Sequence, residues 1–74
     1  MAEGPHDTPE GRVGRVTGAV RAGHTGEVLV AVRGGTERFY AYALDPDDRF
    51  NVGDTVLVTD YHPPRTVSVT AWTI

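Results

Sequence analysis

The sequence contains no cysteine and no lysine, and the first absence excludes whole classes of site. Without thiols the chain has no disulfide, no cysteine nucleophile and no cysteine-based zinc site. It also lacks an apolar run of the roughly 18 residues that a membrane-spanning helix needs. No charged segment followed by an apolar one marks a secretory signal at its start. We therefore expect that these residues do not themselves insert into a membrane.

Positive charge is scarce as well. Ten acidic residues outnumber seven basic ones, all of them arginine, and the formal net charge is −3. A domain that binds nucleic acid usually carries a basic stripe that displaces counterions from phosphates. The acidic excess therefore weighs against nucleic acid as a partner, and the exclusive use of arginine is typical of a GC-rich coding sequence.

The chain is long enough for one small domain only, at 74 residues. Residues 1–11 combine glycine, proline and acidic residues with almost nothing apolar. Such a segment buries too little surface to offset its ordering entropy, so we predict a flexible N-terminal tail in which His6 is solvated. The predicted domain spans residues 12–74.

Apolar and polar residues alternate from Arg12 onward, with the two-residue period of strands that bury one face. Clusters of glycine, proline and aspartate divide this pattern into segments. No stretch keeps a helical period beyond one turn. We predict five strands, at residues 12–22, 27–33, 36–44, 55–61 and 67–72.

Glycines inside this pattern carry two further predictions. Gly14 and Gly18 interrupt the first strand, which indicates a bulge or a sharp bend. Gly34 and Gly35 predict a tight hairpin in which both central residues have positive φ, as a type I′ turn requires.

Five short strands with valine-rich faces favour a closed barrel. A single open sheet would leave those faces wet, and the chain is too short for a second sheet. A long, bent first strand suits a barrel in which one strand pairs on both sides. We therefore predict an all-β fold, a five-stranded OB-fold-type small barrel with a disordered N-terminal tail, in preference to an SH3-like barrel.

Three stretches carry a family resemblance: GRVGRVTGAVRAGHTGEVLVAV, FYAYAL and FNVGDTVLVTDYHPPRTVSVTAW. They resemble the C-terminal soluble domain of NfeD-like proteins. The matching positions are glycines at bends and apolar core residues, among them Gly26, Val28, Phe39, Ala41, Phe50, Gly53, Val56, Val58, Val67 and Val69. The chain departs from the family at Phe39, where members commonly have tryptophan, and in lacking their transmembrane helices.

The resemblance implies a cytoplasmic OB barrel that is fused or tethered to a membrane segment. It further implies work with scaffold proteins of the stomatin or flotillin type. Longer members carry a separate serine protease domain, but no residues of this chain match it, so that activity does not carry over.

No catalytic, metal or cofactor site is expected. Ser68 is the only serine, on the outward face of a strand, and nothing in the sequence places His24 or His62 beside it. The aspartates at 45, 47, 48 and 54 do not match a calcium loop. The histidines lack metal-ligand spacing.

One surface is a candidate for binding. If Phe39, Ala41 and Ala43 face inward, then Arg33, Arg38, Tyr40 and Tyr42 share the outer face of the second and third strands. OB barrels usually bind ligands on this face. The sequence leaves open which face of the third strand is buried, and whether the two tyrosines only pack across the sheet and cover the following loop.

Trp72, outward by alternation, completes the candidate binding residues, because tryptophan is enriched in interface hot spots. We expect a non-enzymatic OB-fold interaction module that binds a protein partner near a membrane. The alternative is an OB domain that binds single-stranded nucleic acid. The partner's identity and the oligomeric state stay open.

Overall fold

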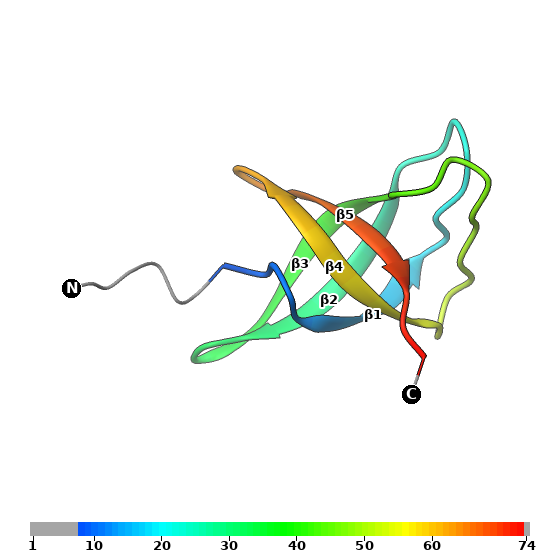
Figure 1. Ribbon diagram of the computed structural model, residues 1–74. Coiled ribbons are helices and arrows are strands. Elements are labelled where there is room, and N and C mark those ends of the chain that lie inside the picture. The colour runs from blue at the N-terminus through cyan, green and yellow to red at the C-terminus, as the bar shows by residue number, and fades with distance from the viewer. Residues whose placement is uncertain (1–7, 74) are drawn as a thin grey trace.

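The computed structural model describes residues 8–73. This part of the chain contains five strands and no helix, hence no helix that could cross a bilayer. The strands, shown in Figure 1, are β1 Val13–Gly18, β2 Gly26–Val32, β3 Gly35–Ala43, β4 Thr55–His62 and β5 Thr66–Ala71.

The strands close into a barrel in the order β1-β2-β3-β5-β4. Only β3 and β5 are parallel, and β1 pairs with both β2 and β4. One strand shared between two neighbours is the arrangement expected of an OB-type barrel, so the predicted fold class is confirmed. The register of β1 shifts between Val16 and Gly18, which is the bulge expected near Gly18.

The core is made of aliphatic and aromatic side chains alone. Phe39 and Ala41 face inward, which settles the open question about β3. No polar or charged residue among residues 8–73 is buried. Period-two alternation predicted the inward faces of β2, β4 and β5, because each of these strands has only one face rich in valine. The members of the core are Val16, Val20, Val28, Val30, Phe39, Ala41, Phe50, Val56, Val58, Val67 and Val69.

Two local predictions require correction. The first strand ends at Gly18, and only an isolated bridge from Val20 to Phe50 continues it. The hairpin turn is centred on Arg33 and Gly34, because Val32 pairs with Gly35. Gly34 has φ +86° and no non-glycine residue of the described range has positive φ, so the signs fit a type II turn and not type I′.

Most of the predicted tail, residues 1–7, lies outside the described residues. Residues 9–12 lie along β4, where Gly11 donates a backbone hydrogen bond to Val58 and Val58 donates one to Arg12, each at 2.9 Å. Pro9 is buried. The chain therefore covers the edge of β4 just beyond its pairing with β1.

Candidate interaction surface

The outer face of β3 presents the predicted tyrosines to solvent. Tyr40 is 56% exposed and Tyr42 is 48% exposed, because β3 alternates between the core and the outside. The Tyr42 hydroxyl accepts a hydrogen bond of 2.9 Å from Thr25, which ties the turn before β2 to this face. Tyr40 is thus displayed where β3 is paired on both sides, and Tyr42 where β3 is paired with β5 alone.

Arg38 belongs to a short polar chain that crosses three strands. Its Nε lies 3.7 Å from a carboxylate oxygen of Glu27 on β2. The other carboxylate oxygen of Glu27 accepts a hydrogen bond of 2.9 Å from the Thr17 hydroxyl on β1. The Arg38 cation is thus balanced by a carboxylate, although its side chain is 67% exposed.

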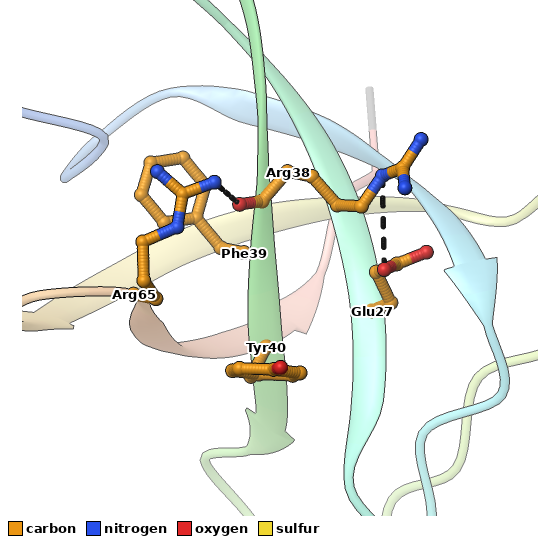
Figure 2. A pocket seen from close by; sticks show the side chains of 5 residues that line it. All are labelled: Glu27, Arg38, Phe39, Tyr40 and Arg65. Atoms are coloured by element: carbon orange, nitrogen blue, oxygen red, sulfur yellow. Dashed lines mark hydrogen bonds and ion pairs between the residues drawn. The ribbon is translucent and has the colours of Figure 1, made fainter.

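A hollow of about 250 Å³ lies beside this chain, and Figure 2 shows the side chains that line it. Arg38 and Glu27 extend to one side of β3, Arg65 lies on the other side across Phe39, and Tyr40 projects below them. The lining combines two guanidinium groups, one carboxylate and two aromatic rings. These groups can contact a peptide through charge, hydrogen bonds and ring surface together.

Sequence reasoning missed Glu27 and Arg65 as residues of this hollow. The Arg65 guanidinium lies 5.3 Å from the centroid of the Phe39 ring and 3.8 Å from a carboxylate oxygen of Glu37. It also donates from Nη2 to the backbone carbonyl of Arg38. Arg65 immediately precedes β5, so only the parallel pairing of β5 with β3 brings it here. No local sequence pattern signals such a contact.

The structure does not gather all predicted binding residues. Arg38 and Tyr40 meet at the hollow, with Tyr42 next along β3. Arg33 lies in the β2–β3 turn and not on the face of β2 as predicted. Trp72 is 41% exposed and follows the end of β5, at the opposite end of the barrel from that turn, because β3 and β5 run parallel (Figure 1).

A second hollow lies over the outer side of β1, β2 and β3, and it is more apolar than the first. Its lining residues are Val13, Gly14, Arg15, Leu29, Ala31, Thr36 and Thr55. Val13, 39% exposed, is its largest strongly exposed aliphatic group. This face adjoins the first hollow across β2 and β3.

One expectation about Ser68 is wrong. The structure places His62 beside it, with 3.1 Å between His62 Nε2 and Ser68 Oγ, because the two residues lie on the outer face of neighbouring strands β4 and β5. Nucleophilic catalysis needs a further group that orients the base. Within residues 8–73, no carboxylate bonds to the His62 ring.

Metal ligation finds no support in the described part of the chain. Residues 8–73 contain no group of three histidine or carboxylate side chains placed to hold a metal ion. The Asp45 carboxylate instead accepts the amide of Asp47 at 2.9 Å, and that of Asp54 accepts the amide of Asn51 at 2.8 Å. Both are turn-stabilising contacts of the kind that aspartate makes with nearby backbone. His6 lies outside the described residues.

Comparison with known proteins gives a family match over residues 13–70, to the NfeD C-terminal domain. The fold is similar to the soluble domain of the NfeD protein YuaF from Bacillus subtilis, with 38% identity, a TM-score of 0.70, and coverage of 82% of this chain and 70% of that one. No curated protein sequence matches the chain significantly.

A second solved structure is similar over a larger share of both chains. It is the soluble domain of a membrane protein implicated in regulation of membrane protease activity from Corynebacterium glutamicum. The identity is 26%, the TM-score 0.68, and the match covers 88% of this chain and 94% of that one. The resemblance seen in the sequence is confirmed.

Proposed function

The chain belongs to the NfeD family, because it matches that family's C-terminal domain. From this membership we propose that it is a non-enzymatic interaction module that binds a protein partner beside a membrane. The observation that carries the proposal is the exposed aromatic face of β3. Tyr40 and Tyr42 are about half exposed on a paired strand, while the core inside is filled by hydrophobic side chains. A ligand would therefore meet the outside of the barrel.

The charges of this face favour a protein partner over nucleic acid. Arg38 is paired with Glu27, and Arg65 with Glu37. A phosphate backbone is usually bound by a basic stripe that displaces its counterions, and the chain as a whole carries a net charge of −3. Exposed tyrosine and arginine are instead enriched in protein interfaces.

Kinship supports the location and the partner class that we propose. The corynebacterial relative is described as the soluble domain of a membrane protein. We propose the same arrangement here, with the barrel on the cytoplasmic side and tethered to a membrane. The proposed partner is a scaffold protein of the stomatin or flotillin type, which the family resemblance implies.

The test is direct binding of the purified chain to a purified stomatin- or flotillin-type protein of the same organism, measured by biolayer interferometry. Replacing both Tyr40 and Tyr42 by alanine should weaken binding by about tenfold or more, because each removes a large contact surface. Val52→Ala is the matched control, since Val52 is 66% exposed and lies in a loop away from this face.

Each result decides a separate part of the proposal. Binding that the tyrosine variant does not weaken would exclude the β3 face. No binding by the wild-type chain would exclude this partner class. Tight, salt-sensitive binding to short single-stranded RNA or DNA would favour the nucleic-acid alternative instead.

A further inference from the structure

At two places in the barrel, a strand extends beyond its pairing with a neighbouring strand. The two edges left in this way differ in what covers them. Beyond the β1 pairing, the edge of β4 is covered by backbone: Gly11 and Arg12 continue the hydrogen bonding to Val58. No backbone among residues 8–73 covers the corresponding gap on β3 in this way. β3 pairs with β2 from Gly35 to Ala41, but with β5 only from Tyr40 to Ala43.

Alternation shows which peptide groups face this gap. The amide of Tyr40 donates to the Arg65 carbonyl at 2.8 Å, so the even-numbered residues of β3 point their peptide groups away from β2. Thr36 and Arg38 therefore direct their N–H and C=O groups outward along an edge that no strand of residues 8–73 pairs with. We call this stretch, Thr36–Arg38, the open edge.

Within the described part of the chain, the Arg65 side chain contacts the open edge. Arg65 Nη2 donates a hydrogen bond to the Arg38 carbonyl, as Figure 2 shows. Arg65 is about half exposed, and its ion pair with Glu37 is long, at 3.8 Å. An exposed ion pair of this kind adds little to hold Arg65 in place. An incoming backbone N–H could take its place on the carbonyl.

We propose that the open edge accepts an extended acidic segment of a partner protein as an added β-strand. The backbone groups of Thr36 and Arg38 supply the ladder for such a segment. This inference rests on the proposed role as an interaction module and names its mode of binding. The added strand lies in line with β5, beside the hollow lined by Arg38, Tyr40 and Arg65.

The charges around the open edge select the partner's chemistry. Arg38 and Arg65 flank it and Arg33 lies in the turn that precedes it, against the carboxylate of Glu37 on the same stretch and that of Glu27 on β2. Arg65, once displaced from the Arg38 carbonyl, is available to a carboxylate of the incoming strand. Charged side chains on a strand edge also disfavour unspecific pairing with other strands. A segment of opposite charge is therefore the one that can pair with this edge.

The probe is a short peptide of alternating valine and glutamate, blocked at both ends, titrated into the full chain by NMR. We expect saturable shifts and slowed amide hydrogen exchange at Thr36 and Arg38. A peptide with lysine in place of glutamate, and an acidic peptide with N-methylated backbone, should each bind at least about fivefold more weakly.

Thr36→Pro is the matched variant of the protein. Proline removes the N–H that faces the open edge, and it leaves the hydrogen bonds between β3 and β2 intact. It should weaken the acidic peptide by about fivefold to tenfold without loss of the folded spectrum. The N-methylated peptide tests the same hydrogen bonds on the unmodified protein, in case the variant does not fold.

Several results would overturn the inference. The first is that the N-methylated or the lysine peptide binds as tightly as the acidic peptide. The second is that amide exchange slows at residues other than Thr36 and Arg38. The third is that these two amides are already protected without peptide and that sedimentation shows the chain to self-associate. If the scaffold protein binds wild type and Thr36→Pro equally, the proposed function stands and the open edge fails. If the acidic peptide protects Arg38 while no scaffold protein binds, the reverse holds.

Discussion

The guanidinium of Arg65 lies 5.3 Å from the centroid of the Phe39 ring, at the point where β5 begins to pair with β3. Phe39 is buried under it and also meets Tyr61 edge-on, with 6.0 Å between the ring centroids. The cation thus covers an aromatic core residue at the place where the two strands diverge. Arg65 therefore occupies the place beside β3 that a paired residue of β5 occupies further along the strand.

Arg65→Ala should destabilise the barrel moderately. The change removes the contact with the Phe39 ring and the hydrogen bond to the Arg38 carbonyl, and the exposed ion pair with Glu37 adds little. We expect a loss of about 1–2 kcal/mol in the free energy of unfolding, measured in urea.

Arg65→Lys is the control for charge alone. A lysine keeps the cation but lacks the planar fork that reaches ring and carbonyl together. It should recover less than half of the loss. Full recovery by lysine would show that charge, and not this geometry, is what matters at the position.

Gly26 is the glycine that the fold can least replace. A Cβ there would lie 2.4 Å from Val20 Cγ2 and 2.7 Å from the carbonyl oxygens of Gly18 and Ala19. Gly26→Ala should therefore cost about 2–3 kcal/mol or prevent folding, because backbone would have to move. The measurement is chemical unfolding of the purified variant, or its soluble yield if it does not fold.

Gly34→Ala makes the comparison for Gly26. A Cβ at Gly34 would have open space around it but a φ of +86°, so only backbone strain opposes it. We expect a cost of about 1 kcal/mol, partly relieved in Gly34→Asn, since asparagine adopts positive φ more readily. A larger effect at Gly34 than at Gly26 would contradict the packing argument.

The strands and their inward faces could be predicted from the sequence, because each depends on a local two-residue period. Val28 and Val30 fall on the buried side for that reason, whereas the sequence left open which face of β3 is buried, and the structure decides it in favour of Phe39. Arg65 could not be identified as part of the candidate site, because its contacts depend on the non-local pairing of β3 with β5. The same limit applies to His62 and Ser68, which meet only across two paired strands.

The contact of residues 9–12 with β4 has no sequence signal either. It is made by backbone hydrogen bonds to Val58, which composition does not reveal. Glu10 adds one contact through its carboxylate, 3.4 Å from the amide of Tyr61. Side-chain periodicity therefore predicts the barrel but not the segment that covers its β4 edge.

Removing residues 1–11 should lower stability in spite of their polar composition. The truncation exposes the surface that Pro9 covers and breaks the hydrogen bond from Gly11 to Val58. We expect a loss of about 1–2 kcal/mol in the free energy of unfolding, because the surface under Pro9 becomes exposed and the Val58 carbonyl loses its hydrogen-bond donor. Glu10→Ala, which removes only an exposed side-chain contact, should change stability by less than about 0.5 kcal/mol.

Phe39→Trp tests whether the barrel has room for the residue that the family commonly carries at this position. Phe39 and Arg65 both line the hollow of about 250 Å³, so the larger indole can extend toward this hollow. Tryptophan is also the best aromatic partner for a cation. We expect a change in stability below about 1.5 kcal/mol in either direction.

In a Trp72→Phe background the indole at 39 should show blue-shifted emission that moves to longer wavelength when Arg65 is replaced by alanine. Emission that ignores the Arg65 change, or a loss of several kcal/mol, would show that the indole does not occupy the space under the guanidinium.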